Sequence, residues 1–409
     1  MNTRGAFDLV ICGGGASAVM LIHALAKHTV LPLEIALVER RPHAGLGRAY
    51  STPSEVHFLN VRVSNMSADA HDRDHLLRWL NEEAPARGHW TPAHFAPRKL
   101  YGEYLKAVLH RASDTPNINI AIFNAAAHEI AQSEQGWQVH LEGGKSLGAG
   151  MAVLATGNEA PAAIGVPGAA QAGERIIADP WDTAAKAKIA STDDVLLLGT
   201  GLTAVDLIAD LVVGGHTGKI VALSRHALLP QSHRAQSPDP CWIAPPFPRP
   251  LEFLRRLRAE LAEAGEYWQS RFDALRPVTQ AIWQSWAESE KRRFLRHAKT
   301  HWNVHRHRIP PETAGRMAGA LAQGKLALMK GRLRKLEPRK GGLRVTVEHA
   351  GQARTVETSW LINCTEPNPN PARSPNPLIA NLIAGGLGRP GPLGLGLDVT
   401  ASLQAVSRD

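Results

Sequence analysis

The amino-acid sequence predicts an α/β fold made of two interleaved, doubly wound domains, with β-meanders and a helical insertion. Two observations lead to this prediction. An apolar run followed by a glycine-rich turn and a helical pattern occurs twice, at residues 8–19 and 194–205. Each copy is followed later in the chain by short alternating strands and a further apolar run, at residues 118–157 and 326–366.

The two glycine-rich turns can be laid over each other. The first is Asp8-Leu-Val-Ile-Cys-Gly13-Gly14-Gly15-Ala16-Ser17-Ala18-Val19, and the second is Asp194-Val-Leu-Leu-Leu-Gly199-Thr200-Gly201-Leu202-Thr203-Ala204-Val205. Both have the GxGxxA pattern of a Rossmann-like dinucleotide-binding domain, in which the glycines let a pyrophosphate approach the backbone at a helix N-terminus. Ser17 and Thr203 place a hydroxyl near each expected pyrophosphate.

The residue expected to meet the adenosine ribose differs in charge between the copies. Glu39 lies 24 residues after Gly15, and Arg225 lies 24 residues after Gly201. A carboxylate accepts hydrogen bonds from free ribose hydroxyls and repels a 2′-phosphate, whereas an arginine does the reverse. We therefore expect two dinucleotides, the second being NADPH, with the adjacent Arg40 and Ser224 in the respective sites. The alternative for Arg225 is a solvated charge at a strand end.

The later strands give each glycine-rich turn its own closing strand. Strands at residues 118–123 and 137–141 precede the apolar run 151–157, in which Thr156 is a candidate cofactor contact. Strands at residues 326–329 and 343–347 precede Leu361-Ile-Asn-Cys-Thr365-Glu366. Alternating strands that lead into an apolar run are typical of a β-meander that returns to a parallel sheet.

The same patterns predict the domain boundaries. Residues 1–157 and 336–409 form the first domain, residues 158–190 a linker, and residues 191–335 the second domain. A helical insertion is expected at about residues 237–310, beginning with a stretch at 237–250 that is too rich in proline for a helix or a central strand. Four tryptophans of the insertion, at positions 268, 283, 286 and 302, either hold it together or line a substrate pocket.

Composition limits the class of protein. At 409 residues, 44% hydrophobic and 20% charged, the chain resembles an ordinary globular protein, and it has no apolar run of the length that spans a bilayer. Since the first strand starts near Phe7, we expect no signal peptide and a cytoplasmic location. The cysteines at 12, 241 and 364 form no CxxC pair, which argues against a redox dithiol and a cysteine-built zinc site.

The net charge of +9 does not by itself indicate nucleic acid. Much of it comes from residues 291–308, where a basic run interleaves with histidines. Such a run is usually a solvated helix face, with a phosphate or an acidic surface as the alternatives. His297 and His301 have a possible metal spacing, but no acidic partner accompanies them, so we expect no metal, no nucleic acid and no membrane partner.

Together these features resemble the two-dinucleotide-binding-domain flavoproteins, and more closely an uncharacterised bacterial FAD/NAD(P)-binding protein family related to flavoprotein monooxygenases. Five further stretches carry the resemblance, which covers most of the chain: Arg41–Ser51, His57–Ser67, Pro97–Leu105, Leu228–Arg234 and His301–Arg308. The resemblance implies FAD in the first site, with Glu39 on its ribose. It also implies that Arg98 and Tyr101 lie near the cofactor and that Gly45, Gly47 and Asn60 form a wall near the flavin. Asn60 has an Asx turn as its alternative.

Two departures from the family pattern bear on the flavin. Glu366 follows Thr365 where relatives carry a glycine, and it adds bulk and charge there. Relatives also continue past Gly394–Val399 with a strand and a final helix that help to enclose the flavin, whereas this sequence stops at Asp409. The expectation is therefore either a sequence cut short or a flavin site that has lost part of its wall.

The expected activity is that of an FAD-dependent, NADPH-using oxidoreductase, monooxygenase-like, with N-hydroxylation as one form of it. A small molecule is the expected substrate and molecular oxygen the electron acceptor, since a dithiol is missing. The sequence identifies neither the substrate nor a catalytic side chain; His233 and Arg234 either touch the nicotinamide or the substrate, or lie on the surface. The alternative is a non-enzymatic nucleotide-binding scaffold or redox sensor with an incomplete flavin site.

Overall fold

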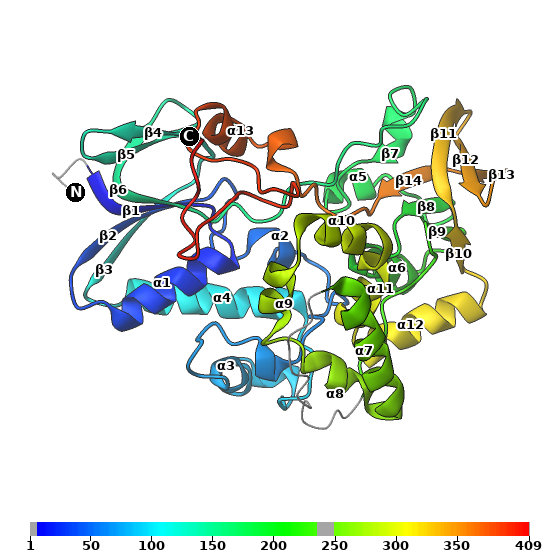
Figure 1. Ribbon diagram of the computed structural model, residues 1–409, viewed down its shortest axis with the longest axis horizontal. Coiled ribbons are helices and arrows are strands. Elements are labelled where there is room, and N and C mark those ends of the chain that lie inside the picture. The colour runs from blue at the N-terminus through cyan, green and yellow to red at the C-terminus, as the bar shows by residue number, and fades with distance from the viewer. Residues whose placement is uncertain (1–5, 235–248, 409) are drawn as a thin grey trace. The chain divides into compact units, whose positions relative to one another are not determined.

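The computed structural model describes residues 6–234 and 249–408, which divide into two compact units (Figure 1). The first unit contains residues 1–160 and 367–409, and the second contains residues 161–366. The chain therefore leaves the first unit and returns to it, and the predicted interleaving is confirmed. The proline-rich stretch 237–248 lies outside the described residues.

The boundaries of the units differ from the predicted ones at both crossings. Residues 336–366 were expected in the first domain, but they belong to the second unit because their last strand, β14 (Trp360–Asn363), pairs in parallel with β8 (Val195–Leu198). The predicted linker, residues 158–190, is also part of the second unit from residue 161 on. It contains the short strand β7 (Ile176–Ile177), which pairs with β14.

A six-stranded sheet forms the centre of the first unit, in the order β3-β2-β1-β6-β5-β4. Its strands are β1 (Ala6–Cys12), β2 (Leu33–Val38), β3 (Ile118–Phe123), β4 (Ala127–Ser133), β5 (Gly136–Leu141) and β6 (Ser146–Leu154). Strands β3, β2, β1 and β6 run parallel, and β6, β5 and β4 form an antiparallel meander. The meander that returns to a parallel sheet is thus present as predicted.

The apolar residues of β1 are buried on both faces of this sheet. Leu9 and Ile11 pack with the helices α1 (Ala16–His28), α3 (His75–Glu83) and α4 (Arg98–Ser113). Val10 and Cys12 face the meander strands and α13 (Pro377–Ala384), which come together on the opposite face (Figure 1). A strand covered on both faces gives a continuous apolar run, which is why residues 9–12 show no polar alternation.

The second unit repeats this plan with a five-stranded parallel sheet in the order β10-β9-β8-β14-β7. Strands β9 (Ile220–Ser224) and β10 (Leu326–Lys330) lie on the far side of β8 from β14. A separate antiparallel meander of β11 (Arg332–Arg339), β12 (Gly342–His349) and β13 (Gln352–Thr358) packs its apolar side chains against one face of the sheet. Helices α6 (Leu202–Val213) and α12 (Pro311–Ala322) pack against each other.

From residue 249 on, where the structure describes it, the predicted helical insertion forms five helices with a core of their own. These are α7 (Pro250–Glu263), α8 (Trp268–Asp273), α9 (Thr279–Ser285), α10 (Glu288–His297) and α11 (Lys299–Arg306). All four tryptophans named above belong to this core or pack against it, so they hold the insertion together. In α7, Leu251 is 57% exposed, whereas Phe253 belongs to this core. Among the described residues, no helix combines the length and apolar character that crossing a bilayer requires.

Candidate nucleotide-binding sites

The first glycine-rich turn, between β1 and α1, has the geometry that only glycine supports. Gly13 has a φ of +110°, and its N–H donates to the carbonyl of Val38 at 2.8 Å. A Cβ on Gly13 would lie 2.3 Å from the carbonyl oxygen of Ala155, at the end of β6. The turn is therefore pressed against backbone, and a side chain at position 13 is excluded.

The second turn, between β8 and α6, has the same geometry. Gly199 has a φ of +130°, and its N–H donates to the carbonyl of Leu223 at 2.8 Å. A Cβ there would lie 2.5 Å from the carbonyl oxygen of Cys364, directly after β14. The correspondence predicted from the sequence thus holds residue by residue, including the closing strand against which each first glycine rests.

The last glycine of each GxG pattern is the N-cap of the following helix, and neither helix has a side-chain cap. Gly15 is the N-cap of α1 and Gly201 that of α6, and neither first turn contains an acidic residue. Ala18 and Ala204 are fully buried, which keeps each helix close to its strand. Uncapped N–H groups at the positive end of a helix dipole favour an anion, so both turns fit a pyrophosphate. Ser17 is exposed and Thr203 half-buried beside these N–H groups.

Glu39, the first residue after β2, is oriented by two backbone N–H groups. Its Oε2 accepts from Gly14 at 2.9 Å and its Oε1 accepts from Arg41 at 2.9 Å, and the side chain is only 7% exposed. A carboxylate has about four lone-pair positions, so each oxygen can still accept from a ribose hydroxyl. The neighbouring Arg40 and, at the end of the closing strand, Thr156 are exposed at the same edge.

The equivalent position of the second unit is built differently. The Thr200 hydroxyl lies 2.9 Å from Ser224 Oγ and donates to the carbonyl of Leu228 at 2.7 Å. Ser224 Oγ also accepts from the N–H of Ala227 at 3.0 Å, so this hydroxyl shapes the turn after β9. In the second unit, the glycine-rich turn is therefore linked to the end of β9 by the contact between Thr200 and Ser224. The next residue, Arg225, makes no such link, and its side chain is exposed to solvent.

A second loop approaches the first turn in unit 1. The N–H of Gly45 donates to the carbonyl of Gly14 at 2.7 Å, and a Cβ on Gly47 would lie 3.1 Å from the Cα of Gly15. Helix α2 (Gly47–Tyr50) then packs on α4, where a Cβ on Gly102 would lie 2.6 Å from the carbonyl oxygen of Tyr50. The structure therefore brings Gly45 and Gly47 next to the first glycine-rich turn, while their expected place in a wall near the flavin stays a prediction.

Arg98 and Tyr101 lie on the first turn of α4, beside α2. Arg98 Nε donates to the carbonyl of Phe58 at 3.1 Å, which holds the segment that contains the half-buried Asn60. The Tyr101 ring packs 4.7 Å from that of Tyr50, and among the described residues the buried Tyr101 hydroxyl has no hydrogen-bond partner. Burial raises the pKa of both tyrosines, and the charge of Arg98 partly offsets this for Tyr50.

Sequence reasoning missed four residues that shape these sites: Gly14, Thr200, Tyr50 and Gly102. Gly14 is needed because a Cβ would lie 2.8 Å from that of Glu39. The sequence could have identified Gly14 and Thr200, because each is the middle residue of its GxG pattern when the two glycine-rich turns are aligned. Tyr50 and Gly102 lie within the stretches quoted for the family resemblance, but only the packing of α2 on α4 distinguishes them.

Glu366, the charged departure from the family pattern, ties the insertion to the sheet. It forms an ion pair with Lys299, and its Oε1 accepts from Asn303 Nδ2 at 2.9 Å. Both partners lie on α11. The carboxylate is therefore drawn towards the insertion at the carboxyl end of β14, and it has a structural use in this chain.

The two cysteines that the structure describes are buried core residues. Cys12 is 1% exposed and Cys364 is 5% exposed. Burial raises the pKa of the Cys12 thiol to about 12, and it raises the pKa of the Cys364 thiol further, with the nearby charge of Asp206 adding to the effect. Neither is a reactive thiolate at neutral pH.

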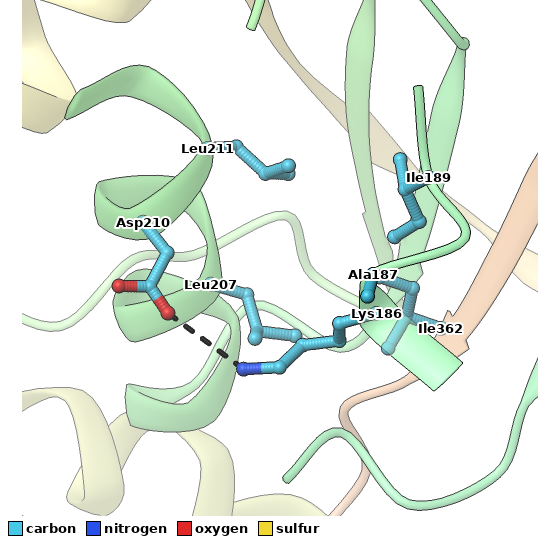
Figure 2. A pocket seen from close by; sticks show the side chains of 7 residues that line it. All are labelled: Lys186, Ala187, Ile189, Leu207, Asp210, Leu211 and Ile362. Atoms are coloured by element: carbon cyan, nitrogen blue, oxygen red, sulfur yellow. Dashed lines mark ion pairs between the residues drawn. The ribbon is translucent and has the colours of Figure 1, made fainter. Parts of the chain in front are cut away.

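A cavity of about 270 Å³ lies elsewhere in the second unit (Figure 2). It is lined by Lys186, Ala187, Ile189, Leu207, Asp210, Leu211 and Ile362. The ion pair of Lys186 with Asp210, at 3.7 Å, crosses it. Since Asp210 lies in the C-terminal half of α6, the cavity is at the opposite end of that helix from Gly201, and we assign it no nucleotide.

Comparison with known proteins supports the geometry. The model of an FAD-NAD(P)-binding family begins to match within β1 and continues to just beyond β6, the first closing strand. Residues 10–159 match that family. The predicted resemblance to FAD/NAD(P)-binding proteins is thus confirmed for the segment that holds the first glycine-rich turn. A search of curated proteins found no match to this chain.

Solved structures resemble nearly the whole chain. The ornithine N-hydroxylase of Kutzneria sp. 744, determined with reduced FAD, NADP⁺ and L-ornithine, is 16% identical with a TM-score of 0.60, covering 93% of this chain and 84% of its own. The ornithine hydroxylase of Pseudomonas aeruginosa is 14% identical with a TM-score of 0.61, covering 93% of this chain and 86% of its own. The L-lysine 6-monooxygenase of Pseudomonas syringae is 14% identical with a TM-score of 0.64, covering 98% of this chain and 89% of its own. These likenesses confirm the predicted fold, with its two dinucleotide-binding domains.

Proposed function

We propose that this protein is an FAD-dependent oxidoreductase that takes electrons from NADPH and acts as a monooxygenase on a small molecule. One observation carries the proposal: two glycine-rich turns of equal geometry are followed, at the same strand position, by a carboxylate in one unit and a guanidinium in the other. The acid suits FAD and the base suits NADPH. The likeness in fold to ornithine and lysine hydroxylases favours a monooxygenase over other flavoproteins.

In the first unit, the residues present fit FAD. The uncapped start of α1 would bind the pyrophosphate, with Gly13, Gly15, Ser17 and Ala18 in the turn. Glu39 would accept from the ribose, since its two oxygens are already oriented. The partnerless hydroxyl of Tyr101 fits a polar ligand near Arg98 and Asn60. FAD, when bound, supplies hydride acceptance and the reduction of oxygen.

In the second unit, the residues present fit NADPH. The start of α6, with Gly199, Gly201, Thr203 and Ala204, would bind the pyrophosphate. Arg225 would pair with the 2′-phosphate, and Ser224 would hold the turn that presents it. Since Cys12 and Cys364 are buried with raised thiol pKa values, we assign the electrons to molecular oxygen and not to a dithiol.

The purified protein tests the proposal directly. We expect mass spectrometry of small molecules released from it to identify FAD, and absorbance at about 450 nm to bleach anaerobically with NADPH faster than with NADH. We expect oxygen to restore the absorbance, and ornithine, lysine and related amines to be the first substrates to try. A colourless protein that does not bind added FAD would instead favour a nucleotide-binding scaffold or sensor.

A further inference from the structure

A group of basic side chains meets at the carboxyl end of β9. The ring of His226, one residue after Arg225, lies 5.5 Å from the ring of His301 on α11. Ser224 pairs with Lys330 across β9 and β10, and the N–H of Gly331 donates to the carbonyl of Ser224 at 3.0 Å. Arg332 follows at the start of β11. Three segments distant in sequence thus converge here, and we name Arg225, His226, His301, Lys330 and Arg332 the basic cluster.

The cations of this cluster are not neutralised by the protein. Within residues 6–234 and 249–408, none of Arg225, Lys330 and Arg332 forms an ion pair, and all three are exposed. By contrast, arginines of the neighbouring meander are paired: Arg334 with Glu348 and Arg344 with Glu357. Like charges held together without a carboxylate repel one another, and this repulsion is relieved when an anion binds.

Helix α11 contributes His301 from a defined position. Lys299 and Asn303, one turn apart, both hold Glu366 after β14, while His301 between them points to His226 after β9. Strand β8 lies between β9 and β14 in the sheet. Helix α11 therefore extends across the carboxyl end of β8, where the second glycine-rich turn begins. Its next histidine, His305, packs against Trp268 and Phe272 instead.

We propose that the basic cluster binds the 2′-phosphate of NADPH, and that protonation of His226, whose ring lies against His301, makes the preference for NADPH over NADH dependent on pH. This inference rests on the proposed function only in taking NADPH as the ligand of the second unit. His226 is faced by His301 from α11, Arg225 from its own turn, Lys330 from β10 and Arg332 from β11. The pair Lys299–Glu366 lies on the opposite side of α11.

The charges around the pair explain why binding would take up protons. The His226 ring is exposed, but partial desolvation, followed by the charges of its basic neighbours in the cluster, lowers its pKa below the ordinary value. A phosphate dianion placed among these groups favours the protonated imidazole. The free protein then carries a neutral His226 and the complex a charged one. NADH, which lacks the phosphate, causes no such change.

The test compares adenosine 2′,5′-bisphosphate with 5′-AMP, which differ only in the 2′-phosphate. Calorimetric titrations in buffers of different ionisation enthalpy, at about pH 7.5, count the protons bound; a phosphate whose pKa is about 6 is already a dianion there. We expect net proton uptake with the bisphosphate and none with 5′-AMP. For each proton taken up, the affinity ratio of the two should fall about tenfold per pH unit as the pH rises.

Variants assign the protons. We expect the double variant His226→Gln and His301→Gln to take up no proton and to lose the pH dependence, while still preferring the bisphosphate through its arginines. The exposed His297→Gln, on α10, should behave as the unmodified protein. Equal uptake in the double variant, or no preference for the bisphosphate in the unmodified protein, would overturn the inference. Neither result depends on whether the protein retains FAD or whether NADH reduces the flavin, so these two measurements test the proposed function separately.

Discussion

The Glu39 carboxylate, at the end of β2, accepts a hydrogen bond at 2.9 Å from the backbone N–H of Gly14, in the middle of the first glycine-rich turn. A Cβ at position 14 would lie 2.8 Å from the Cβ of Glu39, so the glycine is what admits the carboxylate. The residue expected at the ribose and the turn expected at the pyrophosphate are thereby held at a fixed separation before any ligand binds. Such preorganisation reduces the entropic cost of binding.

Replacing Glu39 with alanine should weaken both the turn and the retention of FAD. The change removes the acceptor of two backbone N–H groups, and a hydrogen bond to a charged group contributes about 1.5–3 kcal/mol. The ratio of flavin to protein absorbance and the urea midpoint measure the two effects. Glu34→Ala is the control on the same strand, because Glu34 bonds to Asn119 at the surface and should change stability by less than about 0.5 kcal/mol.

The glycines of the second turn should separate folding from binding. Gly199→Ala places a Cβ 2.5 Å from the carbonyl oxygen of Cys364 at a φ of +130°. We expect the free energy of unfolding to fall by about 3 kcal/mol or more, because the clash adds to the backbone strain. Gly201→Ala meets nothing within 4 Å at a φ of −81°, so it should fold normally. Its methyl group would occupy the space needed by the pyrophosphate. Thermal unfolding and NADPH titration of both variants check this; normal NADPH binding by Gly201→Ala would argue against a nucleotide at this turn.

Arg225→Ala should discriminate between the two nicotinamide nucleotides. Loss of a charge-assisted pair with the 2′-phosphate costs about 1.5–3 kcal/mol, so the apparent NADPH constant should rise tenfold or more. The NADH constant should stay nearly unchanged, because NADH has no phosphate at that position. Steady-state oxidation of each nucleotide measures the effect, with Arg334→Ala as the control, since Arg334 is already paired with Glu348. Equal changes for both nucleotides would exclude Arg225 as the phosphate contact.

Local patterns predicted the strands and turns of this fold, whereas the assignment of segments to units required pairing information. The apolar run 361–364 predicted a strand, and its partner β8 could not be read from it, which is why residues 336–366 were placed in the wrong unit. Similarly, Leu251, Leu254, Leu257 and Leu261 have a helical spacing on α7, but Leu251 is exposed and Phe253, outside that spacing, is buried. An amphipathic pattern defines a stripe, but tertiary packing decides its edges.

The sites show the same division. The glycines, Glu39 and Arg225 follow from a motif whose chemistry is local to the turn and the next strand. His301 and Lys330 lie many residues from Arg225 in sequence, and they meet it only because β9 pairs with β10 and α11 is tied to Glu366. Among residues 291–308, the basic run itself gave no means of telling His301, which faces His226, from His305, which packs inside the insertion.

A last prediction concerns the pH dependence of stability and starts from His75 on α3. Its Nδ1 lies 2.7 Å from the Tyr104 hydroxyl, and that hydroxyl already accepts from the N–H of Ala68. The hydroxyl can donate its proton to Nδ1 only while the imidazole is neutral, so protonation of His75 would remove that arrangement. Burial, followed by the stacked His23, lowers the pKa of His75 below its ordinary value.

The direction of the effect follows from this shift. As the pH falls through about 6.5, the unfolded chain protonates His75 before the folded protein does, so stability present at neutral pH is lost on acidification. Asp69 acts in another window: its pKa is lowered by Lys27, so its contribution is lost only as the pH falls below about 3.9. Urea unfolding between about pH 7 and pH 5 should therefore isolate the histidine contribution. His75→Gln keeps an acceptor for Tyr104 and cannot titrate, so the slope should decrease by up to about 1.4 kcal/mol per pH unit. The control is His89→Gln, because His89 is exposed and forms no ion pair or hydrogen bond among the described residues. An unaltered slope in His75→Gln would show that other groups titrate in this range.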